Sequence, residues 1–221
     1  MRTKILVPVL VATAALTLTA CGGSGDGGDK GDNSAASVSG GRKTGQAIVL
    51  NGDAKTKPDL VLTDTEGKKY DLLKETKGHP TLVFFGYTHC PDVCPLTMSN
   101  LGIAVSKLSK AEREKLRVVM VTTDPERDTP QRMRKWLDAQ GGKDFVGLTG
   151  DFDTIQAGAK PLGIFIEKPK KEKDGSVTVN HGAQVMGFSP KDDKGHWIYT
   201  TSTSPQQYAK DLPKIVKGEN P

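Results

Sequence analysis

The sequence predicts an α/β fold, a layered domain with a central mixed β-sheet flanked by helices. Two uninterrupted apolar runs, residues 81–87 (TLVFFGY) and 118–121 (VVMV), have the pattern of strands buried on both faces. Between them, apolar residues recur with the spacing of one helix face, at Leu101, Ala104, Val105 and Leu108. Strands that alternate with helices are typical of this class.

The flanking elements follow from turn and cap residues. Residues 59–63 and 69–72 surround a Thr-Glu-Gly turn, which predicts an N-terminal β-hairpin. Asp128-Thr129-Pro130 predicts a helix start, with a capping side chain and proline at the first helical position. We further expect a strand at 145–148, a helix at 153–162, a basic loop at 167–173, strands at 177–179 and 184–188 around a corner at 180–182, a strand at 196–200 and a C-terminal helix from Ser204.

The first 45 residues differ in composition from the rest. Residues 1–20 have the charged start and apolar run of a signal peptide, and the run ends Leu-Thr-Ala before Cys21, as in a bacterial lipobox. The alternative is an ordinary signal peptide with a chance cysteine. Residues 21–45 are rich in glycine and predict a disordered, lipidated tether, followed by a folded domain at 46–221. We therefore expect a lipid anchor on Cys21 at the extracytoplasmic face of the cell membrane, where disulfides persist.

Composition and charge limit the class of protein and its possible partners. With 35% hydrophobic residues, the 221-residue chain has enough apolar side chains to bury one core. Its formal net charge is +5, and removing Arg2 and Lys4 with the leader leaves +3. So small an excess does not point to nucleic acid.

Two cysteines follow the first buried strand, in Cys90-Pro-Asp-Val-Cys94, at a predicted helix start. This layout resembles a thioredoxin-like site with one extra residue between the cysteines. If 91–94 enter the first helical turn, the two Cβ atoms lie about 5–6 Å apart, close enough for both sulfurs to bind one metal ion. Thiolates favour Cu(I) or zinc, and a modest shift would also allow a disulfide. A third ligand is needed, and the four histidines, His79, His89, His181 and His196, leave that choice open.

Three segments together resemble the Sco/SenC copper proteins. They are 85–95 (FGYTHCPDVCP), 124–130 (DPERDTP) and 145–150 (FVGLTG), and His181 falls where that family carries its copper-binding histidine. The resemblance runs from about residue 59 to 217. It implies a thioredoxin-like fold and one copper ion, Cu(I) or Cu(II), held by Cys90, Cys94 and His181. It also implies copper delivery to the dinuclear copper centre of cytochrome c oxidase subunit II, with copper supplied by an upstream donor.

Three further side chains are candidates for tuning this site. The family often has Asp before the histidine, where this chain has Asn180, which can hydrogen-bond but brings no charge. Asp92 and Asp124 are expected to support the ligands or to contact a partner. For Asp124, a turn at the end of a strand is an equally good interpretation.

An enzyme is the main alternative to a metallochaperone. A thiol–disulfide reductase would use Cys90 and Cys94 as its redox pair, to keep the oxidase's ligand cysteines reduced. Such enzymes normally carry two residues between the cysteines and a proline before the strand that faces them, and both features are missing here. A redox-inert interaction domain is the third interpretation.

Overall fold

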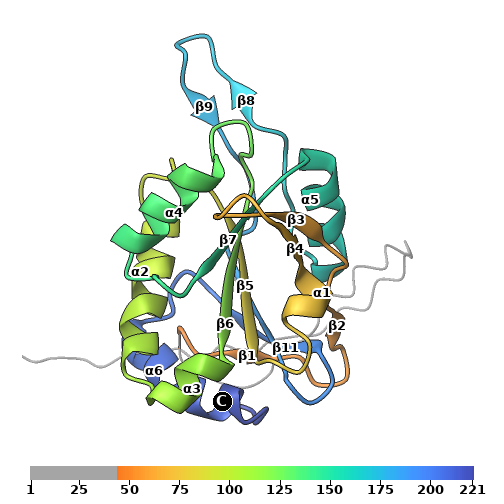
Figure 1. The fold of residues 1–221 in the computed structure, drawn as a ribbon, viewed down its shortest axis with the longest axis vertical. Helices are drawn as coiled ribbons and strands as arrows, with labels where there is room; N and C mark the ends of the chain where they lie inside the picture. The colour runs from red at the N-terminus through yellow and green to blue at the C-terminus, as the bar shows by residue number, and fades with distance from the viewer. Residues whose placement is uncertain (1–43) are drawn as a thin grey trace, which may run out of the picture. The chain divides into compact units, whose positions relative to one another are not determined.

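The computed structural model describes residues 44–221. In this part of the chain, nine strands form one mixed sheet in the order β1-β11-β10-β5-β6-β7-β3-β4, with β2 paired to β11 (Figure 1). The strands are Ile48–Val49 (β1), Lys55–Thr56 (β2), Val61–Asp64 (β3), Lys69–Asp71 (β4), Thr81–Gly86 (β5), Arg117–Thr122 (β6), Val146–Thr149 (β7), Val185–Phe188 (β10) and Lys194–Tyr199 (β11). The central strands β5, β6 and β7 are parallel, and the other neighbours are antiparallel. The predicted mixed sheet is thereby confirmed.

Helices cover both faces of the sheet. Figure 1 shows α2, α3, α4 and α6 on one side and α1 and α5 on the other. Their bounds are Leu72–Glu75 (α1), Val93–Ser106 (α2), Lys110–Lys115 (α3), Pro130–Ala139 (α4), Phe152–Ala159 (α5) and Pro205–Val216 (α6). Among the described helices, none combines the length and apolar character needed to cross a membrane.

Strand β5 explains why its sequence is apolar throughout. Leu82 and Phe84 join the core under α2, whereas Val83 and Phe85 join the core on the opposite face. All four side chains are fully buried. Because successive side chains of a strand point to opposite faces, a strand covered on both sides has no polar positions. The site described below lies at the C-terminal end of this rigid strand.

The predicted N-terminal hairpin is present, formed by β3 and β4. Gly67 lies in its turn with φ +78°, a conformation that glycine adopts without strain. The predicted signal peptide, Cys21 and the predicted tether up to residue 43 lie outside the described residues.

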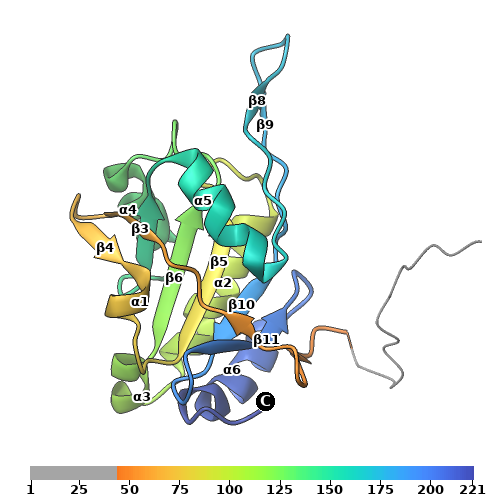
Figure 2. The same cartoon turned by 90° about the vertical axis from the view of Figure 1, so that its right-hand side faces the viewer.

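Two expectations for the chain need correction, and two short strands were missed. The basic segment 167–173 is not a plain loop, because Lys170–Lys171 (β8) pairs with Val177–Thr178 (β9) in a hairpin that projects from the domain (Figure 2). The turn at Asp174-Gly175 closes this hairpin, and Gly175 has φ +85°. The predicted helix 153–162 is divided into α5 and a short 3-10 helix, Lys160–Leu162, since Pro161 has no N–H to continue the α-helical pattern. The two-residue strands β1 and β2 were not predicted.

Candidate metal centre

The two cysteines lie on the loop that connects β5 to α2, residues 87–92, called here the cysteine loop, and on the first turn of α2. Asp92 caps the helix, because its Oδ1 accepts a hydrogen bond from the Val93 N–H at 2.6 Å. Helix α2 therefore begins at Val93. Cys94 is inside the helix, whereas Cys90 precedes the cap by two residues. The premise that residues 91–94 enter the helical turn is thus wrong for 91 and 92.

Cys90 nevertheless stays at the amino end of the helix. The backbone N–H of Cys94 donates to Cys90 Sγ over 3.4 Å. A hydrogen bond from the Cys94 thiol, together with the N–H groups of Cys94, Asp92 and Val93, lowers the pKa of Cys90 to about 5. Exposed N–H groups at a helix start stabilise negative charge in this way. Cys90 is partly exposed and is therefore a thiolate that solutes can reach.

Cys94 has the opposite character. Its side chain is fully buried. Donation of its thiol proton to Cys90 and burial both raise the pKa of Cys94. The pair therefore holds one proton between the two sulfurs, with the charge on Cys90 and the proton on Cys94.

His181 reaches the site from a distant part of the sequence. It pairs with Ile166 as an isolated antiparallel bridge at the base of the β8–β9 hairpin. Two backbone hydrogen bonds flank this bridge, from Gly182 N–H to Phe165 O at 2.7 Å and from Glu167 N–H to Asn180 O at 2.8 Å. The histidine is thus held by strand-like pairing rather than by an unsupported corner.

The ring of His181 has one nitrogen available for a ligand. Its Nδ1 lies 3.0 Å from the carbonyl oxygen of Gly182. A carbonyl can only accept, so Nδ1 carries the proton and Nε2 carries the free lone pair. A backbone partner of this kind commonly orients a metal-binding imidazole.

One open cavity of about 550 Å³ brings Cys90 and His181 together. Tyr87 also lines it, with its ring edge-on to the His181 ring at a centroid separation of 5.6 Å. Burial, followed by the negative charge of the Cys90 thiolate, raises the pKa of Tyr87 to about 12. Tyr87 is therefore a neutral part of the cavity lining, in contact with the His181 ring. Two sulfurs and one imidazole nitrogen are a donor set that fits a soft metal ion such as copper.

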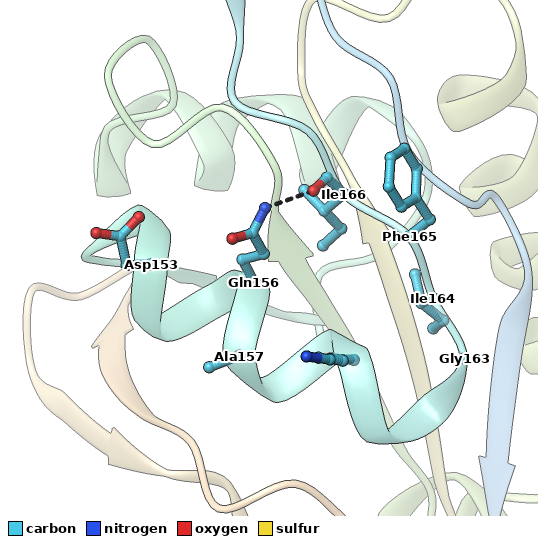
Figure 3. Close-up of a pocket in the computed structure, with 8 residues that line it drawn as sticks. Asp153, Gln156, Ala157, Gly163, Ile164, Phe165 and Ile166 are labelled. Carbon is cyan, nitrogen blue, oxygen red and sulfur yellow. Dashed lines mark hydrogen bonds between the residues drawn. The ribbon is translucent and has the colours of Figure 1, made fainter.

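A second cavity also has Phe165 in its lining (Figure 3). It is formed by α5 and the segment 163–166, and Gln156 Nε2 closes one edge by donating to Ile166 O at 2.7 Å. Its titratable side chains are Asp153 and Lys160. Neither is a soft ligand, so this cavity lacks the kind of donor set that Cys90 and His181 offer in the first one.

The three residues predicted to support the site have different surroundings in the structure. Asp92 lines the cavity and caps α2. Asn180 also lines the cavity. Its side-chain Nδ2 donates to Glu167 Oε2 at 2.8 Å, at the base of the β8–β9 hairpin, and not to the His181 ring. Asp124 is buried and paired with Arg127, and burial is the main cause that raises the pKa of Asp124. Asp124 does not line the cavity.

Sequence reasoning missed Asp128. The cap of α4 is Thr129, whose Oγ1 accepts from the Arg132 N–H. The Asp128 carboxylate instead accepts hydrogen bonds from Thr88, in the cysteine loop. The Asp-Thr-Pro sequence within the second motif was the available signal, but it fits a helix start equally well.

The fold and this cavity define a class: a thioredoxin-like domain with two thiols and an imidazole gathered beyond its central strand. A family model described as SCO1/SenC matches residues 49–217, and the chain belongs to this family. The structure of Bradyrhizobium japonicum ScoI with copper bound is 31% identical, with a TM-score of 0.64 over 72% of this chain and 99% of that one. The apo Sco1 protein from Thermus thermophilus is 28% identical, with a TM-score of 0.65 over 76% and 94% of the two chains.

The curated relatives agree over a more limited span. A Stutzerimonas stutzeri protein named "Putative copper-binding protein" is 35% identical over 141 residues, 63% of this chain and 67% of that protein. The mitochondrial SCO1 homolog 1 of Arabidopsis thaliana is 31% identical over 118 residues, 53% of this chain but 35% of that protein. The chain thus spans about a third of the length of this mitochondrial relative.

Proposed function

We propose that this protein is a membrane-tethered copper chaperone on the extracytoplasmic face of the membrane, with Cys90, Cys94 and His181 as its copper ligands. The observation that carries the proposal is that Cys90 and His181, 91 positions apart in the sequence, line one cavity with Cys94 hydrogen-bonded to Cys90. The copper-bound structure of the ScoI relative from Bradyrhizobium japonicum supports copper as the metal.

The two oxidation states of copper would use the three ligands differently. Cu(I) is a soft ion that two thiolates already satisfy, whereas Cu(II) prefers nitrogen and oxygen donors in a tetragonal arrangement. Cys94 must lose its proton when the metal binds, since thiolates are the ligands. The open cavity leaves Cys90 accessible, so the ligands of an acceptor protein can approach the metal from solvent.

We propose that the acceptor is cytochrome c oxidase subunit II, at its dinuclear copper centre, and that an upstream donor loads the chain. Membership of the SCO1/SenC family supports this role. BsSco, which shares the fold, is described as a member of the Sco family of cytochrome c oxidase assembly proteins. The lipobox-like sequence before Cys21 supports a lipid anchor.

A thiol–disulfide reductase is the second candidate, and the asymmetry of the cysteines favours it. The Cys90 thiolate would attack a substrate disulfide, forming a mixed disulfide and releasing one substrate thiolate. Cys94 would then lose its proton and attack Cys90 Sγ, which releases the second substrate thiolate and leaves a Cys90–Cys94 disulfide. An upstream dithiol would have to reduce that disulfide after each cycle.

Replacement of His181 by alanine separates the two candidates. A copper chaperone should keep part of its Cu(I) affinity, lose or alter its Cu(II)–thiolate absorption and fail to support oxidase assembly in cells. The Cys90→Ser and Cys94→Ser variants are the matched controls, and both should fail in Cu(I) binding and in assembly. If His181→Ala cells assemble active oxidase like wild type while the double cysteine variant does not, the reductase is the better function.

A further inference from the structure

Asp128 is a fully buried carboxylate whose two oxygens are both engaged near the cysteine loop. Its Oδ2 accepts from the Thr88 N–H at 2.9 Å and from Thr122 Oγ1 at 2.7 Å. Its Oδ1 accepts from Thr88 Oγ1 at 2.5 Å. Arg132, from α4, adds a bond from its Nε to the same Thr88 hydroxyl at 3.0 Å. Three parts of the chain, β6, α4 and the cysteine loop, thus meet around one carboxylate.

Thr88 lies two residues before Cys90, and the Cys90 N–H donates to Tyr87 O at 3.3 Å. Fixing Thr88 therefore fixes the start of the short turn that carries the Cys90 sulfur. We propose that Asp128 is a positioning residue, whose carboxylate anchors the cysteine loop so that Cys90 Sγ stays at the amino end of α2 and faces His181 across the cavity. The copper readout in the test below rests on the proposed function.

The same cluster is not a second metal site. His89, Asp124 and Asp128 place their potential ligand atoms within 4.8 Å of one another. However, hydrogen-bond donors already occupy both Asp128 oxygens, and Arg127 pairs with Asp124. A metal ion would have to displace these donors. The arrangement is that of an anchor, because hydrogen bonds already engage both oxygens of Asp128.

A carboxylate suits this position better than an amide. Three donors converge on Asp128, two N–H or O–H groups on one oxygen and a third on the other. An ionised carboxylate only accepts, so it can satisfy all three. The amide of asparagine has one oxygen and must turn its NH₂ group toward one of these partners. Asp128→Asn therefore keeps the size of the side chain and weakens the anchor, although it also removes the negative charge that lies 3.6 Å from His89 Nδ1. Thr88→Val weakens the anchor without removing that charge.

The test compares Asp128→Asn with Asp211→Asn in the full chain, purified in detergent and reduced. Asp211 is an equally buried carboxylate that accepts from Tyr199 OH and Gln207 Nε2, so it controls for the loss of a buried charge. Two readouts are measured: Cu(II) affinity, and the rate at which iodoacetamide alkylates Cys90 at pH 6. Thermal melting is recorded for both variants.

We expect Asp128→Asn to weaken Cu(II) binding by about 10-fold or more, the usual effect of losing an outer partner of a metal site. Alkylation of Cys90 should slow by about 5-fold or more, because a displaced Cys90 loses the N–H groups that hold it as a thiolate. Asp211→Asn should change neither readout. Wild-type values of both readouts in Asp128→Asn, with melting lowered equally in the two variants, would overturn the positioning role.

A second variant tests the same role of Asp128. If Asp128→Asn does not fold, Thr88→Val removes the hydroxyl bonded to Asp128 and should move both readouts in the same direction. Unchanged readouts in a folded Thr88→Val chain would then overturn the proposal. If the wild-type chain binds no copper, the proposed function fails, while the alkylation rate of Cys90 still decides the role of Asp128.

Discussion

The hydrogen bond between the two thiols can be removed without touching Cys90. In Cys94→Ala no proton donor remains on that side chain, whereas in Cys94→Ser a hydroxyl takes the place of the thiol. The Cys94 thiol is the largest cause of the low pKa of Cys90. We therefore expect the alanine variant, and not the serine variant, to raise that pKa clearly.

The size of the effect follows from the strength of the bond. A hydrogen bond to a charged group contributes roughly 1.5–3 kcal/mol, and one pKa unit corresponds to about 1.36 kcal/mol. Loss of the thiol donor should thus raise the pKa of Cys90 from about 5 to about 6–7. The N–H groups of residues 92–94 remain in this variant and keep the pKa below the usual value of about 8.5. In Cys94→Ser the pKa should stay close to about 5.

Alkylation by iodoacetamide measures this pKa, since only the thiolate reacts. Rates between pH 4.5 and 9 are followed by peptide mass spectrometry, which separates Cys90 from the other cysteines. Because the folded-state pKa is lowered, the thiolate of wild type should persist as the pH falls and be lost only near about pH 5. A wild-type midpoint near about 8.5, or identical midpoints for Cys94→Ala and Cys94→Ser, would refute the reasoning.

Three further outcomes are expected. Gly86→Ala would place its Cβ 2.5 Å from the buried Phe84 ring and 3.0 Å from Cys94 Sγ, so urea unfolding should show a loss of about 1–3 kcal/mol, and an unchanged midpoint would contradict this packing. Oxidation of Cys90 and Cys94 to a disulfide should block copper uptake until the bond is reduced; full copper loading of protein shown by mass spectrometry to be oxidised would exclude this. Cys21→Ala should release the domain or leave its precursor unprocessed, and fractionation that finds it processed and membrane-held would count against the lipid anchor.

Strand β5 and a helix that begins close to the two cysteines could be predicted from the sequence. Strand β5 is a local feature, because a strand covered on both faces must be apolar along its length. The cap of α2 was missed, since Asp92 was expected to support the ligands or to contact a partner. The spacing of Cys90 and Cys94 favoured metal binding or disulfide exchange over a purely structural role. The proposed third ligand was different: the residue types left four histidines open, and only the resemblance to a family pointed to His181.

The meeting of distant residues at the site could not be predicted, because it depends on the folded arrangement of the chain. His181 is held by Ile166, and Thr88 is anchored by Asp128, which lies 40 positions further along the chain. The side chain of Asn180 bonds to Glu167, a choice that its position next to His181 did not reveal. Strands as short as β8 and β9 have too few residues to show a periodic pattern. The same local sequence can also place an aspartate either as a helix cap or as a buried group that anchors a loop. Which of these occurs depends on the donors that the fold brings within hydrogen-bond distance.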